Sequence, residues 1–120
     1  MIAIGVGCRR GISAEAVIAL VRRAGMGADG LFTLDSKSNE AGLIEAAKIL
    51  GLPIHFLPSA SLRAMDDDIV TRSDHSLQAT GIASVAEASA LVGAGKNARL
   101  ILPKISGDGV SCAVAAGDAP

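Results

Sequence analysis

Aromatic residues and cysteines are scarce in this chain: its 120 residues include two Phe, no Tyr, no Trp and two Cys. With only two aromatic side chains it lacks the stacking platforms of proteins that bind single-stranded nucleic acids. A net charge of −1 argues against a nucleic-acid or anionic-membrane partner attracted by bulk charge. Two cysteines make neither a disulfide framework nor a metal cluster, so we expect a reduced cytoplasmic compartment and no metal. No cofactor is expected either. No apolar run approaches the ~20 residues of a membrane span, and the first residues lack a signal-peptide layout.

The apolar half of the sequence consists mostly of Ala, Val, Ile and Leu, and it is accompanied by 14 glycines. A chain of this length with this apolar content can bury a core, and we expect residues 1–120 to form one domain. The glycines indicate tight turns between short elements.

The first half alternates short apolar runs with amphipathic helical patterns. Strands are predicted near residues 2–6, 31–34 and 54–57, and helices over 14–24 and 40–50. Short connections in this β-α-β-α-β order imply parallel strands joined by right-handed crossovers.

The middle of the chain is less regular. A single helical turn is predicted near residues 61–65, a solvated loop at 66–68 and a short helix at 73–80. Ser84 and Glu87 have the spacing of a capping box, which predicts that a third long helix begins there.

Two further strands, 99–102 and 110–115, flank the hairpin signal Gly-Asp-Gly at 107–109. The predicted fold class is therefore α/β: a single three-layer domain around a mixed five-stranded sheet. The sheet starts with the β-α-β-α-β unit and ends with an antiparallel hairpin.

The turn after the first strand is the feature around which we build a site. It holds three glycines, two arginines and the predicted N-cap of the next helix: Gly5, Gly7, Gly11, Arg9, Arg10 and Ser13. A strand, a glycine turn and a helix N-terminus together create an anion site. The spacing matches neither the Walker nor the dinucleotide pattern, which disfavours a cofactor pyrophosphate. The alternative is a tight turn with solvated arginines.

Ligands of open α/β sheets bind outside the carboxyl ends of the parallel strands. There the glycine turn would meet the polar segment that carries Asp35 and Lys37, and the turn at Gly81 could face the same side. Lys104, after the fourth strand, is either a loop charge or a further contact. Several cations in a slightly acidic chain predict a pocket for a ligand with several carboxylates.

The chain resembles the CobE and CbiG C-terminal domain family of cobalamin (vitamin B12) biosynthesis in three segments, GVGCRRGIS at 5–13, TLDSKSNEAGL at 33–43 and GIASVAEASAL at 81–91. The resemblance spans about residues 2–115. It implies a precorrin or corrinoid ligand, a tetrapyrrole with acetate and propionate arms. CbiG opens the ring lactone of cobalt-precorrin-5A and releases acetaldehyde, whereas the chain looks like the stand-alone CobE type. The resemblance thus implies a pathway and a ligand class and leaves the reaction open.

Three residues are candidates for catalysis, each with a structural alternative. Cys8 is either a nucleophile activated by the turn or a small packed residue. Glu40 is either an acid–base group or the surface partner of Lys37. Glu87 is first of all the capping-box carboxylate. His75, in a polar segment, is interpreted as solvent-facing.

Three functions stay open from the sequence. The first is binding of a precorrin or corrinoid intermediate through a cationic glycine-rich cleft. The second is a hydrolase-like reaction on a precorrin, as in CbiG. The third is docking onto a pathway methyltransferase, so the expected partners are a small-molecule tetrapyrrole and other enzymes of the pathway.

Overall fold

The computed structural model describes residues 1–25 and 27–118, and these residues are built around one five-stranded sheet. The strand order is β3-β2-β1-β5-β4. The strands are β1 (Ile2–Cys8), β2 (Gly30–Leu34), β3 (Ile54–Leu57), β4 (Arg99–Gly107) and β5 (Val110–Ala116). β1, β2 and β3 are parallel, while β5 runs antiparallel to both β1 and β4. The predicted mixed sheet, with its parallel start and its C-terminal hairpin, is confirmed.

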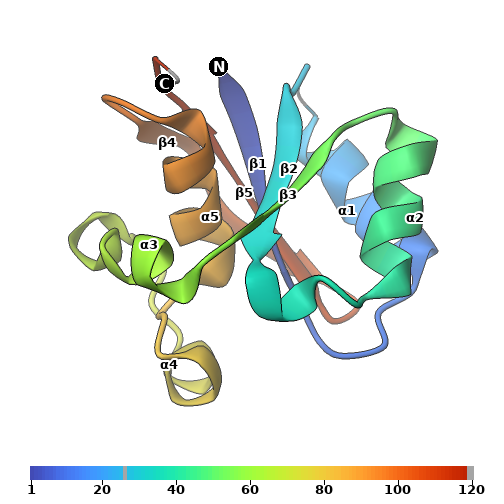
Figure 1. Cartoon of the computed structure of the whole chain (residues 1–120), viewed down its shortest axis with the longest axis horizontal. Coiled ribbons are helices and arrows are strands. Elements are labelled where there is room, and N and C mark those ends of the chain that lie inside the picture. Colours follow the sequence, from blue (N-terminus) through green and yellow to red (C-terminus); the bar gives the residue numbers. More distant parts are fainter. Residues whose placement is uncertain (26, 119–120) are drawn as a thin grey trace.

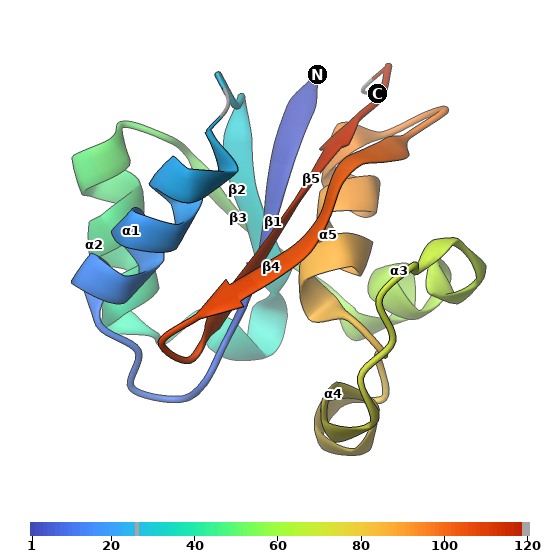
Figure 2. The same ribbon diagram turned by 180° about the vertical axis from the view of Figure 1, so that it is seen from behind.

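Helices cover both faces of the sheet and give three layers (Figure 1). α1 (Ala14–Ala24) and α2 (Ala41–Leu50) lie side by side on one face, whereas α5 (Val85–Ala94) lies on the other and contacts α3 (Ser59–Arg63). α4 (Asp74–Thr80) projects from the end of the molecule where the parallel strands finish (Figure 2). Two 3-10 turns complete the chain, η1 (Asp35–Lys37) and η2 (Asp66–Asp68).

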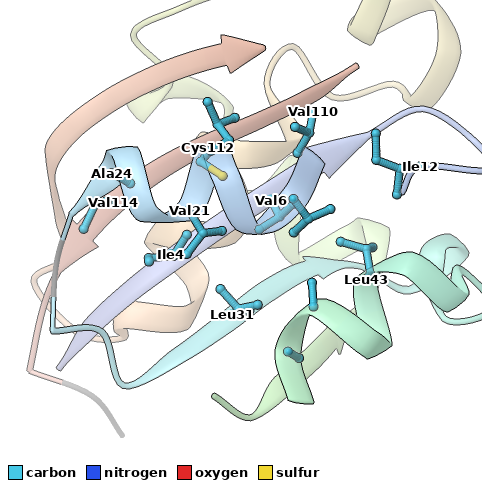
Figure 3. Close-up of a cluster of buried hydrophobic side chains, with 14 residues drawn as sticks. Ile4, Val6, Ile12, Val21, Ala24, Leu31, Leu43, Val110, Cys112 and Val114 are labelled. Atoms are coloured by element: carbon cyan, nitrogen blue, oxygen red, sulfur yellow. The ribbon is translucent and has the colours of Figure 1, made fainter. Parts of the chain in front are cut away.

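The first helix forms where its caps and its apolar stripe predict it. The Ala16 N–H donates to Ser13 Oγ at 3.1 Å, and Gly25 ends the helix in the left-handed conformation. Its inward residues pack with Ile4, Val6 and Leu31 of the sheet (Figure 3). This cluster is the largest of the three clusters in the core of the described residues, and it packs α1 and α2 against the sheet.

On the opposite face of the sheet, α5 is buried on nearly all sides, whereas α1 buries only one face. Its sequence is rich in alanine, and this lets the helix backbone approach the sheet at Gly5 of β1. Gly5 therefore lies beneath α5 and serves helix–sheet packing.

The structure corrects three local predictions. β4 extends to Gly107, beyond the predicted end at 102, because an edge strand tolerates Pro103 and two register irregularities between Leu100 and Ile105. The helical turn near 61–65 begins two residues earlier, as α3. Residues 66–68 form η2 in place of an open loop.

The two ends of the described chain lie close together at the end of the molecule opposite α4 (Figures 1 and 2). The amino group of Met1 donates to the carbonyl oxygen of Gly117 at 3.1 Å. Among the described residues, none of the helices has the length and apolar character that crossing a bilayer requires.

Replacing Ser84 with alanine is expected to lower the free energy of unfolding by about 1 kcal/mol. Ser84 Oγ accepts the Glu87 N–H at 3.2 Å, so the substitution leaves a buried donor at the start of α5 unpaired. Urea denaturation would measure the change. Ser89→Ala is the matched control in the same helix: the Ser89 hydroxyl is buried without a hydrogen-bond partner in the described chain, so its removal should cost nothing. Equal unfolding midpoints for the Ser84 variant and wild type would show that the cap contributes no stability.

Candidate functional site

A cleft of about 420 Å³ opens at the carboxyl ends of β1 and β2. The glycine turn after β1, η1 after β2, the β4–β5 hairpin, the N-terminus of α5 and one side of α4 all contribute to its walls. The residues that line it are Gly7, Cys8, Arg9, Leu34, Lys37, Ser73, His75, Ser76, Ala79, Thr80, Ser84, Val85, Ala86, Lys104, Gly109 and Ser111.

Five of the residues predicted from the sequence meet in this cleft: Gly7, Cys8, Arg9, Lys37 and Lys104. They come from three separate segments, which the parallel strands and the hairpin bring to one edge of the sheet.

Arg9 is held in place by the hairpin. Its backbone N–H donates to the Gly109 carbonyl oxygen at 2.9 Å. Gly109 has a φ of +82°, and a Cβ built on it would lie 2.7 Å from Arg9 Nε. The absence of a side chain at residue 109 thus leaves room for the arginine to lie across the hairpin tip.

Four of the remaining predicted site residues lie in the glycine turn or beside it but do not line the cleft. The Gly11 N–H donates to Glu40 Oε1 at 2.9 Å, which ties the glycine turn to the start of α2. Ser13 caps α1, and Arg10 is exposed outside the lining.

Two predicted site residues farther along the chain also lie outside the lining of the cleft. Asp35 is an exposed residue that begins η1, and Gly81 is the left-handed C-cap of α4. Neither belongs to the lining of the cleft.

Glu87 has a different role from the capping box predicted for it. Its side chain is fully buried, and its carboxylate turns away from the helix start to accept three backbone N–H groups. These are Val70 at 2.7 Å, Thr71 at 3.0 Å and Lys104 at 2.9 Å. The reciprocal half of the capping box is therefore wrong, while the Ser84 half is confirmed. Glu87 therefore connects its own helix, α5, both to the segment that precedes α4 and to β4. All three border the cleft.

Electrostatics at Glu87 favour the charged form. Burial raises the pKa of the carboxyl, but the backbone N–H groups of Lys104, Thr71 and Val70 lower it by more, so the pKa lies below its usual value of 4.5. An ionised carboxylate committed to three donors has little capacity left to transfer a proton to a ligand.

Cys8 lines the cleft, yet it is not an activated thiol. Burial raises its pKa above 9.0, Lys37 lowers it by less, and Glu40 adds to the increase. The residue therefore stays a protonated thiol at neutral pH, a form that is a weak nucleophile. Cys112 on the neighbouring strand is buried, and burial raises its pKa to about 12.

The lining also contains residues that the sequence analysis did not assign to the site. α4 and its N-cap supply five of them: Ser73, His75, Ser76, Ala79 and Thr80. The sequence offers one weak signal for this placement: the helix lacks an apolar stripe, so it has no core face to bury.

The charged groups of the cleft are of one sign. Arg9, Lys37 and Lys104 line it together with His75, and no Asp or Glu of residues 1–25 and 27–118 takes part in the lining. Leu34, Val85, Ala79 and Ala86 add apolar surface. Such a lining suits an anionic ligand with an apolar body.

Comparison with known proteins gives concordant matches to a family model and to a related protein. Residues 2–115 match the family model described as cobalamin synthesis G C-terminus. Over 109 residues the chain is 38% identical to Protein CobE of Sinorhizobium sp, which covers 85% of this chain and 71% of that protein.

Two solved structures are also similar. The crystal structure of CobE, a protein from the cobalamin (vitamin B12) biosynthetic pathway, matches with a TM-score of 0.89 and 39% identity, covering 96% of this chain and 89% of that one. The crystal structure of the cobalamin biosynthesis protein chiG from Agrobacterium tumefaciens str. C58 matches with a TM-score of 0.79 and 37% identity, covering 98% of this chain and 99% of that one.

Proposed function

The chain belongs to the cobalamin synthesis G C-terminus family, and from this premise we propose that it binds a tetrapyrrole intermediate of cobalamin biosynthesis in the cleft at the carboxyl edge of its sheet. Precorrins carry acetate and propionate arms around an apolar macrocycle. The arms would meet Arg9 and Lys37, and the ring would lie against the apolar lining.

The main support for this proposal is that the charged side chains lining the cleft are all cationic. The whole chain has a net charge of −1, so a lining with three cationic residues and no described acid departs from the average of the surface. Confining like charges in one cleft is unfavourable until an anion neutralises them. A polycarboxylate does so with charge-assisted hydrogen bonds.

Binding, and not covalent chemistry, is the function that the side chains favour. The three residues considered for catalysis are each unsuited to it in their own way. Cys8 is protonated, Glu40 is bound to the turn backbone, and Glu87 is buried with three donors. We therefore expect the protein to hold or deliver its ligand unchanged. Mass spectrometry of the ligand after prolonged incubation with protein would reveal turnover if there were any.

Replacing Arg9 and Lys37 together with alanine is expected to weaken corrinoid binding about 100-fold. Each charge-assisted hydrogen bond is worth roughly 1.5 kcal/mol, and two of them give about 3 kcal/mol. Titration with hydrogenobyrinic acid, followed by its visible absorbance, would measure the dissociation constant.

The double variant Arg10→Ala with Lys48→Ala is the matched control for this titration. It removes two exposed cations that do not line the cleft, so it should bind like wild type. A wild-type protein that binds no corrinoid would refute the proposal. Equal losses in the two double variants would place the ligand elsewhere.

A further inference from the structure

Residues 73–83, which we call the α4 lobe, project as α4 from a neck whose last two residues, Ile82 and Ala83, are buried in the core. The Ser73 N–H donates to the Ala83 carbonyl oxygen at 3.0 Å, which closes the neck. Inside the lobe, Ser76 Oγ donates to the Ile82 carbonyl oxygen and Thr80 Oγ1 donates to that of Ser76, both at 2.7 Å. The lobe is thus held together by its own hydrogen bonds.

α4 itself contributes nothing to the core. None of its residues is buried, and both views show it standing clear of the layers that cover the sheet (Figures 1 and 2). A seven-residue helix is not stable alone, so its caps and the bonds of the lobe must maintain it. α4 is therefore ordered although it covers none of the core, and one side of it lines the cleft instead.

Two positions on this side differ from the hydroxyl residues around them. The imidazole of His75 makes none of the hydrogen bonds found in the described chain, so its nitrogen atoms are free for a ligand. Ala79 follows one turn later on the same face and leaves space open. By contrast, the Ser76 and Thr80 hydroxyls are used within the lobe.

Residues of the lobe and of the glycine turn both line the cleft. The ribbon views place these two segments apart from each other at the end of the molecule where the parallel strands finish (Figures 1 and 2). A small anion can reach only one of these walls, whereas a ring with carboxylates on more than one edge can reach both. We propose that the α4 lobe is the specificity-determining wall of the cleft: His75 binds a second carboxylate of the tetrapyrrole, and Ala79 admits the edge of the macrocycle. This inference rests on the proposed function and adds to it which residues select the ligand.

The test is a corrinoid titration of variants within one helix. Ala79→Trp fills the space on the cleft side and should weaken binding of hydrogenobyrinic acid about 30-fold. Gln78→Trp, the same substitution at the neighbouring exposed residue outside the lining, should bind like wild type. His75→Ala should weaken binding about fivefold, through the loss of one polar contact.

Each outcome has a defined meaning. Ala79→Glu serves as a second probe if the tryptophan variant is poorly folded by circular dichroism, because a carboxylate at an exposed helical site repels the ligand and is less bulky than an indole. If the Ala79 and His75 variants bind like wild type while the Arg9 and Lys37 double variant does not, the inference about the lobe is overturned and the proposed function stands. If wild type itself binds no corrinoid, both are overturned.

Discussion

Gly5→Ala is expected to destabilise the protein by roughly 4 kcal/mol, more than the 1–3 kcal/mol typical of overpacking a core. A Cβ at this position of β1 would overlap the carbonyl oxygen of Ala86 and lie 2.5 Å from the nitrogen of Ala90. Both are main-chain atoms of α5, so no side chain can rotate away and the whole helix must shift. Urea denaturation would measure the loss, and a fall in soluble yield would accompany it.

Gly7→Ala is the matched control, two residues along the same strand and on the same face. There a Cβ would lie 3.5 Å from the Val85 Cβ, an ordinary van der Waals distance. We expect a change below about 1 kcal/mol. Similar losses for the two alanine variants would contradict the explanation by close approach, because they would reflect strand propensity alone.

Glu87→Ala is expected to lower the free energy of unfolding by about 4 kcal/mol at pH 7. The substitution removes the acceptor of three backbone N–H groups at a fully buried site, and each donor left unsatisfied costs roughly 1–3 kcal/mol. It also releases the segment before α4 from β4, so corrinoid binding should weaken too. Urea denaturation would give the stability.

The same residue predicts a pH dependence. Because the pKa of Glu87 is lower in the folded protein than its usual value of 4.5, its stabilisation is present above that pH. It is lost as the pH falls through the folded-state pKa. Glu87→Gln should therefore be less stable than wild type at pH 7, and the difference should narrow at pH 3. Glu45→Gln, at an exposed site of α2, is the control. A gap that stays constant with pH would show that the charge of Glu87 does not matter.

Local patterns predicted much of this fold because its elements carry their own signals. Ser13 and Ser84 cap the helices that they were expected to cap, and the Gly-Asp-Gly turn forms the hairpin. The extension of β4 could not be predicted, because whether a strand tolerates Pro103 depends on its being at the edge of the sheet. That residues 1–120 constitute one domain stays a prediction.

The site was predicted less completely, for a reason that differs between its two sides. Arg9 and Lys37 follow strands, and the topology of parallel strands brings such residues to one edge. His75 was interpreted as solvent-facing, and it is indeed exposed, yet it lines the cleft. The position of His75 depends on the hydrogen bond that closes the neck at Ser73 and on the hydrogen bonds of Glu87. The backbone groups that Glu87 binds at Thr71 and Lys104 lie 16 and 17 residues away in sequence. A local sequence pattern cannot predict hydrogen bonds between residues so far apart in the chain.

The order of strands also determines when this protein can fold. β1 is made before the other four strands, yet it occupies the middle of the sheet, and its register with β5 pairs Ile2 with Ala116. On the ribosome, β1, β2 and β3 can associate early, but the other edge of β1 stays open until β5 has emerged. Contacts of such long sequence separation slow folding and expose an apolar edge meanwhile. Completion of the sheet is therefore a late step in folding, and the cleft, which needs the hairpin to hold Arg9, forms with it.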